Sequence, residues 1–599
     1  AAATFTALLV YARTLAPGLT EIDSGELSAV AATLGIAHPS GYPLFSVLGR
    51  VWTMATPLRV ITATNLLSAV LAAASVLLLF RVIRDLLPER AGAARTAGAW
   101  TGALAFAFHP GLWSVAVVTE VHALQMFLDA ALLHAVVRSG LWGGGAFRER
   151  AFLFLGYLAG LCLANHLTSA LLLPAVAWGA WKCRRSLRPG VLAGAAAMGL
   201  LGLSVYLFLP VRSAQQPLLD WGSPETWEAF RRHVSGAQYR VWIFSSGETI
   251  VKNAPQLAAG LLGFTAPLLL LIPPGLMRAR KVPGLLTGSV LMAACAAIYP
   301  FGYSIHDIAT YFLPAYLIVS VWIGLGAARL HEWMSCGRFA ALRPALLVLP
   351  AVPLVISWRS VDRSGETWVE TMARAALETP APGAVLLNAY WDALHSPAIY
   401  LQAVEGVRRD VVLLDQEHFR RSWNVPWLRS HHPELLAGLE AEADRLQELV
   451  LRFEREEPYD PAEIQAAFEA LLNGILEKAA RAGGAYVTQE IEPGVGAPRT
   501  RVPEGILFRL ENPMNVPPPG GEAPWPELPP PGDGDVYAEQ ARGYCSRMAS
   551  VGALRLYQAG DREGARRLLL RAMEWTPGDP GLRANLDMLD AEGPPPAER

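Results

Sequence analysis

Residues 21–56 read EIDSGELSAVAATLGIAHPSGYPLFSVLGRVWTMAT, and this stretch decides what fold we expect. It is too polar to cross a membrane and too apolar for a freely hydrated loop. Ser24 is a favourable N-cap for a helix over 25–34, and Pro43 can begin a second helix over 43–54. Both helices would be amphipathic, so we expect them to lie at a membrane interface.

Apolar blocks flank this loop and continue to residue 358. The chain of 599 residues is 52% hydrophobic and only 17% charged, with a mean hydropathy of +0.29, whereas soluble chains carry about a quarter charged residues. A spanning helix needs about 20 apolar residues, and about eleven blocks approach that length. They cover 1–16, 60–80, 96–112, 121–137, 151–164, 167–181, 190–210, 256–277, 284–302, 309–328 and 342–358. The sequence predicts a polytopic α-helical membrane domain over 1–358, followed by a soluble part.

Arginine and lysine are concentrated in every second loop, at 81–95, 138–150, 182–188, 278–281 and 329–343. The positive-inside rule makes these loops and the N-terminus cytoplasmic, and an odd number of spans then leaves the soluble part outside. We interpret the first block as a retained helix and not as a signal peptide. The expected location is the inner (cytoplasmic) membrane, with several passes through the bilayer.

The alternate, outer loops carry acids, amides and histidines. These are Asp23, Glu26, His38, Glu120, His122, Asn165, His166, His306 and Asp307, with the polar segment 212–252 between the last two groups. Loop polarity alone would explain any one of these loops. Five in succession favour a single functional site at the outer face.

Composition excludes several other classes of protein. A net charge of -2 without a basic cluster among aromatics gives no reason to expect nucleic acid as a partner. The five cysteines form no disulfide framework and no metal-binding spacing. Arginine far outnumbers lysine, which suggests a GC-rich bacterial genome.

Several motifs follow one another in an order that resembles the protein O-mannosyltransferase-like family. They are DSGEL, LGIAHPSGYPLFSVLGR, PGLWSVAVVTEVHAL, GLCLANHLT, LPVRSAQQPLLDWGSPETWEAFRRHVSGAQY, YSIHDIATYFLPAY and AIYLQAVEGVRRDVVLLD, and the likeness runs from residue 8 to 428. The resemblance implies the GT-C fold of membrane glycosyltransferases, which take a sugar from a polyprenyl phosphate at the outer face. It also implies no cofactor. Acids at positions 23, 26 and 307 can bind a divalent metal, but GT-C mannosyltransferases typically need none.

The resemblance assigns roles to particular residues. GT-C enzymes place their catalytic acid just beyond the first span, which makes Asp23 and Glu26 the expected catalytic pair, with Asp23 as the general base. Two acids at the start of a helix are also an ordinary capping pattern. Groups that hold the departing phosphate must be positive or donate hydrogen bonds, and the candidates are Arg212, His38, His166, Arg50 and Arg13. Arg13 and Arg50 can equally extend to lipid headgroups. Further site candidates are Glu120, His122, Asn165, His306 and Asp307.

Two of the histidines also have an ordinary structural explanation. His38 can stabilise a tight Pro–Gly turn, and His166 can cap the helix that it begins. Asp129, which shares a helical stripe with His122 and Gln125, is not part of the family motifs and is interpreted as structural.

The soluble part is expected to hold three segments. Residues 359–512 should form an α/β domain, because VLLN and VVLLD read as strands on either side of a short helix. The family's pair of acids after the first strand is reduced to Asp392 here, which leaves a ligand role for that turn open. Residues 513–534 are a Pro/Gly-rich linker, and 535–592 show the pattern of a tetratricopeptide-like helical segment.

The leading functional hypothesis is a glycosyltransferase. It would move a hexose, as the family moves mannose, from a polyprenyl phosphate to Ser or Thr of an exported protein. A lipid or cell-wall glycan is the alternative acceptor. A transporter or flippase is the non-enzyme alternative, which the nearly charge-free span centres and the absence of repeated halves disfavour.

Overall fold

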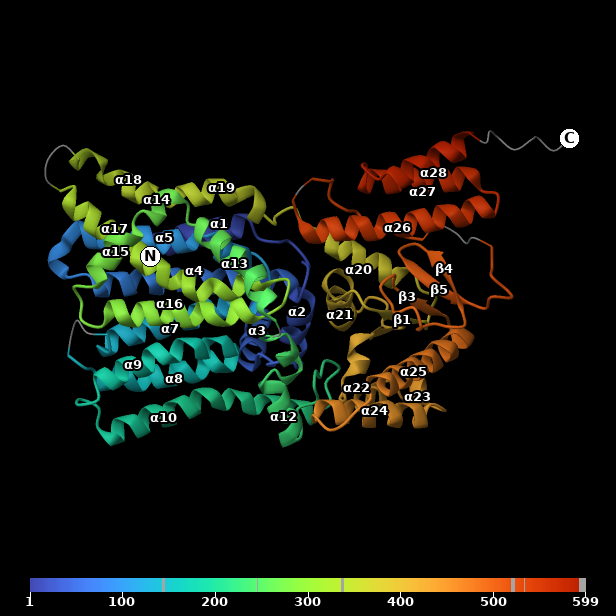
Figure 1. The fold of residues 1–599 in the computed structure, drawn as a ribbon, viewed down its shortest axis with the longest axis horizontal. Helices are drawn as coiled ribbons and strands as arrows, with labels where there is room; N and C mark the ends of the chain where they lie inside the picture. Colours follow the sequence, from blue (N-terminus) through green and yellow to red (C-terminus); the bar gives the residue numbers. More distant parts are fainter. Residues whose placement is uncertain (143–145, 245, 336–338, 519–522, 533, 592–599) are drawn as a thin grey trace. The chain divides into compact units, whose positions relative to one another are not determined.

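The computed structural model describes residues 1–599 except 143–145, 245, 336–338, 519–522, 533 and 592–599, so part of the predicted linker lies outside the described residues (Figure 1). The chain divides into two compact units. Ala1–Pro17 and Val30–Gly365 form the first, which we call the helical unit. Gly18–Ala29 and Glu366–Arg599 form the second, which we call the α/β unit. The predicted division into three soluble segments stays a prediction.

The helical unit is built from helices joined by short turns. Its helices are α1 (Ala2–Arg13), α3 (Pro43–Ala55), α4 (Val60–Leu86), α5 (Gly92–Ala107), α6 (Pro110–Ala116), α7 (Val121–Ser139), α8 (Glu149–Asn165), α9 (Leu173–Lys182), α10 (Pro189–Leu203), α11 (Phe208–Ser213), α12 (Trp227–Val234), α13 (Gly247–Leu262), α14 (Ala266–Leu269), α15 (Ile272–Ala279), α16 (Leu285–Gly302), α17 (Leu313–Trp333), α18 (Arg343–Val348) and α19 (Ala351–Val361). Helix α2 (Ser24–Thr33) runs across the division between the units.

Six stretches of the described chain are helical, long and apolar enough to cross a membrane. They are Val60–Leu86, Val121–Ser139, Pro189–Ser213, Leu285–Gly302, Ile308–Trp333 and Ala340–Val361. The pair Gly247–Leu262 and Ala266–Ala279, bent by 89°, would make a seventh. A multi-pass helical membrane protein is thereby confirmed. The remaining expected spans correspond to shorter helices, such as α5 with 16 residues and α8 with 17, so the number eleven stays a prediction.

Small residues let α8 and α10 approach closely. A Cβ atom on Gly156 would lie 2.2 Å from the Ala195 carbonyl oxygen, and one on Gly160 would lie 2.1 Å from the Gly199 carbonyl oxygen. Association of helices in a membrane depends on this kind of close packing, because lipid supplies no hydrophobic driving force between helices.

Gly160→Leu should therefore destabilise the helical unit. The leucine side chain would overlap the backbone of α10, which cannot move aside without disturbing the helix. We expect the free energy of unfolding to fall by about 1–3 kcal/mol or more. Thermal unfolding in detergent measures the effect. Gly190→Leu, on the same helix pair at a position with no atom within 4 Å of its Cβ, is the matched control. Equal melting temperatures for the two variants would contradict the packing described.

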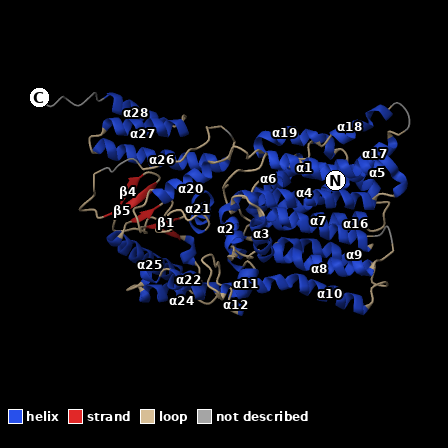
Figure 2. Cartoon of the chain, turned by 180° about the vertical axis from the view of Figure 1, so that it is seen from behind, coloured by secondary structure: helices blue, strands red, loops and turns tan. Residues whose placement is uncertain are grey.

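The α/β unit contains a five-stranded sheet with the order β2-β1-β3-β5-β4. β1 pairs in parallel with β2 and β3, while β5 pairs antiparallel with β3 and β4. The strands are β1 (Val385–Asn388), β2 (Val412–Asp415), β3 (Ala485–Val487), β4 (Thr500–Glu504) and β5 (Leu507–Glu511). β1 and β2 correspond to the predicted VLLN and VVLLD. Figure 2 shows the strands within this unit alone.

Helices cover this sheet and continue beyond it. They are α20 (Trp368–Glu378), α21 (Ser396–Ala403), α22 (Asn424–His431), α23 (Pro433–Leu436), α24 (Glu440–Glu454), α25 (Pro461–Ala482), α26 (Val536–Gln558), α27 (Arg562–Trp575) and α28 (Pro580–Ala591). Buried Phe468, Leu472 and Ile475 on α25 pack with Leu387 of β1 in one core. The last three helices pack in sequence, α26 on α27 and α27 on α28. Their tetratricopeptide-like character stays a prediction.

Candidate active site

Ring side chains from four separate segments of the helical unit meet at one place. The Tyr42 hydroxyl lies 3.2 Å from His38 Nε2, and the Tyr42 ring stacks on His166 with centroids 5.9 Å apart. The His166 ring lies 5.0 Å from that of His122, and Tyr311 lies 5.2 Å from His122 and 5.5 Å from His166. We call these five residues the imidazole–phenol cluster. It unites four loops that the sequence predicts to be on the outer side.

Hydrogen bonds fix the two central imidazoles of this cluster. Gln125 connects His122 to Thr168. Its Oε1 lies 2.9 Å from His122 Nδ1, and its Nε2 donates a hydrogen bond of 2.9 Å to the Thr168 hydroxyl. That hydroxyl lies 2.6 Å from His166 Nδ1. Because the Nδ1 atoms of both histidines are engaged, each ring has a set orientation, with Nε2 as its other polar atom.

The surroundings of His166 favour its neutral form. Burial lowers the pKa of His166, and the neighbouring His122 and His38 lower it further. His166 therefore offers this cluster a neutral imidazole and not a fixed positive charge. A phosphate close to these rings would stabilise their protonated form. Such a cluster can hold an oxyanion and respond to the charge that develops on it.

The two predicted catalytic acids lie in the segment 18–29, which folds with the α/β unit. Trp391 Nε1 donates a hydrogen bond of 2.8 Å to Asp23 Oδ1, and the backbone N–H of Glu26 donates to the Ser396 hydroxyl at 3.0 Å. A Cβ atom on Gly25 would lie 2.2 Å from the Ser396 carbonyl oxygen, so the glycine of DSGEL permits this close approach. The turn between β1 and α21 and the first residue of that helix thus hold the segment that carries the acids. A ligand role for this turn stays open.

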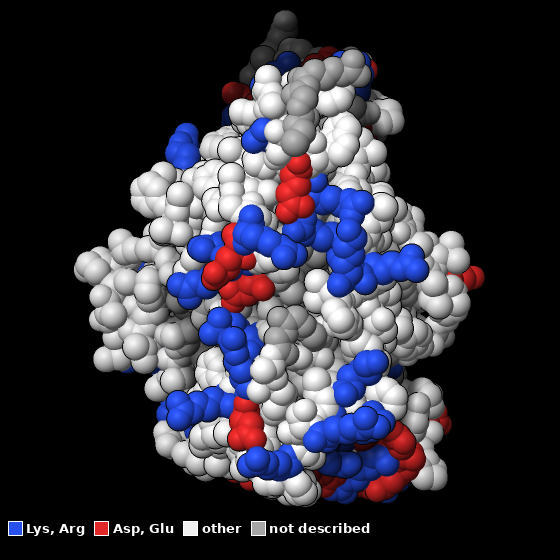
Figure 3. Space-filling view, turned by 90° about the vertical axis from the view of Figure 1, so that its left-hand side faces the viewer, with Lys and Arg blue, Asp and Glu red and all other residues white. Residues whose placement is uncertain are grey.

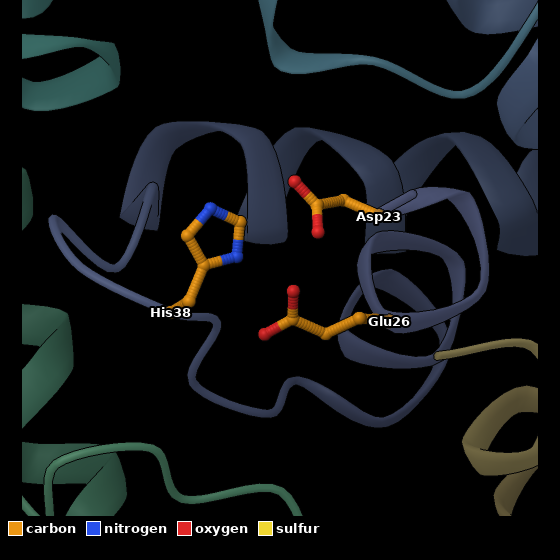
Figure 4. Close-up of side chains that lie close together, drawn as sticks. All are labelled: Asp23, Glu26 and His38. Atoms are coloured by element: carbon orange, nitrogen blue, oxygen red, sulfur yellow. The ribbon is translucent and has the colours of Figure 1, made fainter. Parts of the chain in front are cut away.

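Figure 4 shows the side chains of Asp23, Glu26 and His38 directed toward one another around α2. One ligand atom from each of the three lies within 4.8 Å of the others. Glu26 is buried, with 2% of its surface exposed, whereas Asp23 and His38 are half-buried. Among the described residues this is the one group of three side chains that could hold a metal ion. Two carboxylates beside an imidazole are equally suited to moving a proton, and the expectation that no metal takes part stays a prediction.

Two of the predicted phosphate-binding arginines lie at the C-terminal end of α2. Arg212 donates from Nε and Nη2 to carbonyl oxygens of residues 33–34, at 2.7 and 3.2 Å, and Arg50 donates to the carbonyl oxygen of Ala32. Carbonyl groups at a helix C-terminus lack partners within the helix, and cations there are favourable. In this arrangement both side chains stabilise α2. A role on phosphate stays a prediction for them.

The other candidates are not among the five residues of the cluster. Arg13 Nη1 donates to the Ser364 hydroxyl at 3.2 Å, which places it at the end of α1. Asn165 is buried and donates to the carbonyl oxygen of Val121 at 3.3 Å. Glu120 precedes α7, Asp307 precedes the short helix Ile308–Phe312, and His306 is exposed. Asp129 accepts a hydrogen bond of 2.8 Å from the Ser169 hydroxyl, and its structural interpretation stays a prediction.

The sequence-based list of site residues omitted Tyr42, Tyr311 and Trp391. Tyr42 and Tyr311 stand inside the quoted motifs HPSGYP and HDIATYFLP, so a signal existed: a phenol beside a conspicuous histidine. Trp391 lies in AYWDALHSP, about 370 residues from Asp23 along the chain. Nothing local in the sequence connects the two.

Comparison with known proteins shows which proteins this chain resembles in sequence. Residues 23–186 match the model described as the Protein O-mannosyl-transferase TMEM260 N-terminal domain. The predicted resemblance is confirmed. The mouse protein named Protein O-mannosyl-transferase TMEM260 is 25% identical over 462 residues, which are 71% of this chain and 63% of the mouse protein. A Dictyostelium discoideum protein of the same name is 24% identical over 250 residues, or 39% of this chain and 29% of that protein. The chain thus spans less than two thirds of the length of these relatives.

Solved structures with similar arrangements were also found. ArnT from Cupriavidus metallidurans in the apo state has 13% identity and a TM-score of 0.48, covering 70% of this chain and 90% of its own. The same enzyme bound to undecaprenyl phosphate has 14% identity and a TM-score of 0.45, covering 85% and 97%. The apo oligosaccharyltransferase of Archaeoglobus fulgidus has 12% identity and a TM-score of 0.46, covering 71% and 66%.

Proposed function

We propose that this chain is a membrane glycosyltransferase that moves a hexose, in the first instance mannose, from a polyprenyl phosphate to Ser or Thr of an exported protein. The observation that carries the proposal is the imidazole–phenol cluster, in which side chains from four loops of the same expected side converge. The likeness to proteins named O-mannosyl-transferase supports the same reaction.

In this proposal the transfer is a direct displacement at the anomeric carbon. Asp23 takes the proton of the acceptor hydroxyl as its oxygen bonds to that carbon, while the bond from the carbon to the phosphate oxygen breaks. The indole N–H of Trp391 orients the Asp23 carboxylate through Oδ1. Glu26, which is more deeply buried, supports the position of the acceptor.

The leaving group is the polyprenyl phosphate. Negative charge grows on its oxygens in the transition state, and hydrogen-bond donors aimed at that charge lower the barrier. His38, His122 and His166 supply imidazole nitrogens, and Tyr42 and Tyr311 supply hydroxyl groups. We assign the phosphate to this cluster in place of Arg212 and Arg50, because both arginines are engaged by the backbone of α2.

The full chain, purified and reconstituted, should transfer radiolabelled mannose from a polyprenyl phosphate to a Ser/Thr-rich peptide. Label that appeared only in lipid or glycan would indicate the alternative acceptor. Movement of the labelled donor across the bilayer without any transfer would indicate a flippase and overturn the proposal. Mass spectrometry of exported proteins from cells with and without the gene identifies the natural acceptor by the hexose that is lost.

The proposed topology has about eleven spans, a cytoplasmic N-terminus and an outer α/β unit. In a variant without native cysteines, Ala214→Cys should react with a membrane-impermeant thiol reagent in intact cells, and Arg280→Cys should not. Both positions are exposed on the protein, so accessibility reports the side of the membrane. Equal labelling at the two positions would contradict the proposed orientation.

A further inference from the structure

A large pocket lies at the ends of helices that carry the imidazole–phenol cluster at their other ends. Its volume is about 1190 Å³, and it is lined by Arg138 and Arg329 near the C-termini of α7 and α17. His122 lies at the N-terminus of α7, and Tyr311 lies just before α17. A helix of 19 residues such as α7 is roughly 28 Å long. The pocket is therefore on the opposite side of the membrane-spanning bundle from the proposed active site.

This pocket is strongly positive. Eight arginine and lysine side chains line it against three carboxylates, a formal excess of five positive charges. Figure 3 looks onto this end of the molecule and shows basic side chains, in blue, outnumbering acidic ones, in red.

The acids of the pocket compensate only some of these charges. Arg278 forms two hydrogen bonds to Glu332, of 2.6 and 3.0 Å. Asp85 lies 3.9 Å from Arg95 and 3.7 Å from Arg138. Among the described residues no carboxylate lies within 4.0 Å of the other five basic side chains, which are Arg90, Arg148, Lys281, Arg329 and Arg343. Arg343 donates hydrogen bonds to the backbone oxygens of Met334 and Ser335.

The positive-inside rule explains why inner loops are basic but not why their charges converge. The loop at 182–188 carries four basic residues and contributes none of them to the pocket. Arg90, Arg148 and Lys281 instead come from three different connections between helices, Arg329 comes from the last turns of α17, and together they line one space. Like charges held together repel one another, and an anion of several charges removes that cost.

The surroundings of the pocket indicate that the anion belongs to a lipid. Met277 and Trp333 are the chain neighbours of the lining residues Arg278 and Glu332, and they are 56% and 64% exposed. Trp at the end of a spanning helix typically lies at the headgroup level of the bilayer. An apolar surface beside a basic pocket fits a molecule with acyl chains and a phosphate headgroup, and not a free anion.

We propose that this pocket binds the phosphate headgroup of an anionic phospholipid of the inner leaflet. Basic pockets between spanning helices on this side recognise such headgroups through arginine–phosphate hydrogen bonds and charge. The proposal rests on the pocket alone and holds whichever sugar or acceptor the outer site uses.

The test compares two variants with the same change in net charge. In the pocket variant Arg90, Arg148, Lys281 and Arg329 are replaced by Gln. In the control variant the four basic residues of the loop at 182–188 are replaced by Gln, namely Lys182, Arg184, Arg185 and Arg188. Native mass spectrometry in neutral detergent counts retained diphosphatidylglycerol, with phosphatidylcholine as the uncharged reference. We expect wild type and control to retain the anionic lipid, and the pocket variant to bind it about tenfold more weakly or worse, since each basic residue near an anionic headgroup contributes about fivefold.

Three outcomes would overturn the proposal. If both variants lost the anionic lipid equally, its binding would be due to general attraction by basic loops and not to the pocket. If wild type retained the two lipids equally, the pocket would not select an anionic headgroup. Displacement of the lipid by inorganic pyrophosphate at similar concentration would make the ligand a soluble polyphosphate. The last two measurements use wild-type protein, so they decide the matter even where the pocket variant does not fold.

Discussion

Asp23→Asn should lower the rate of hexose transfer by about a hundredfold or more, the scale on which general-base catalysis contributes. Asparagine keeps the shape of the side chain, and its carbonyl oxygen can still accept the hydrogen bond from Trp391 Nε1. It cannot take a proton from the acceptor hydroxyl. Donor binding should be nearly unchanged, because the proposed phosphate site lies on other residues. Single-turnover transfer measures the rate, and retention of the polyprenyl phosphate measures donor binding.

Glu26→Gln is the matched control for this variant. It removes one carboxylate from the same end of α2 at a buried position, and we expect a smaller reduction in transfer. The reverse order of effects would make Glu26 the base and Asp23 its support. Wild-type rates for both variants would show that the catalytic centre lies elsewhere.

His166→Phe should reduce kcat/KM for the lipid-linked donor by roughly ten- to a hundredfold, because a hydrogen bond to a charged group is worth about 1.5–3 kcal/mol. Phenylalanine keeps a ring that can stack on Tyr42 but removes both ring nitrogens. Titration of transfer against donor concentration measures the change. A fall in the affinity for unlabelled polyprenyl phosphate should accompany it, since the proposed contact is with the phosphate.

His134→Phe provides the comparison. His134 lies toward the opposite end of α7 from His122, with its Nε2 at 3.2 Å from Asp85. This substitution makes the same chemical change outside the cluster and should leave kcat/KM unchanged. A similar loss of kcat/KM in both variants would indicate a general effect on the helices. It would contradict the assignment of the donor phosphate to the cluster.

Local signals predicted the positions of the two helices in the first loop. The expected N-cap and amphipathic character of the first helix were wrong, because Ser24 lies inside α2 with its hydroxyl bonded to the backbone of Thr20, and residues 24–31 are all buried. The expected helices over 25–34 and 43–54 correspond to α2 (Ser24–Thr33) and α3 (Pro43–Ala55). A proline at the first helical position fixes a helix start from within a few residues, so this part needed no tertiary information. The parallel strands β1 and β2 were predictable for a similar reason, because short apolar runs flank a helix.

Contacts between distant segments could not be predicted in this way. Whether a candidate arginine faces a ligand or the end of a helix depends on which backbone lies beside it, and Arg212 and α2 are about 179 residues apart. The same applies to the expected spans, because an apolar block can fold as one helix or as two helices bent by 89°. Hydropathy reports how apolar such a block is, but it does not report whether the helix bends within the block.

The membership of residues 18–29 in the α/β unit has a consequence for the order of events during synthesis. Trp391 and Ser396, the partners of Asp23 and Glu26, are translated 368 and 370 residues after those acids. Domains generally fold as units as the chain emerges. The nascent protein can therefore insert its helices into the bilayer while the acids still lack their support, and the arrangement of Asp23 and Glu26 proposed for catalysis is completed only after translation has passed the turn that follows β1.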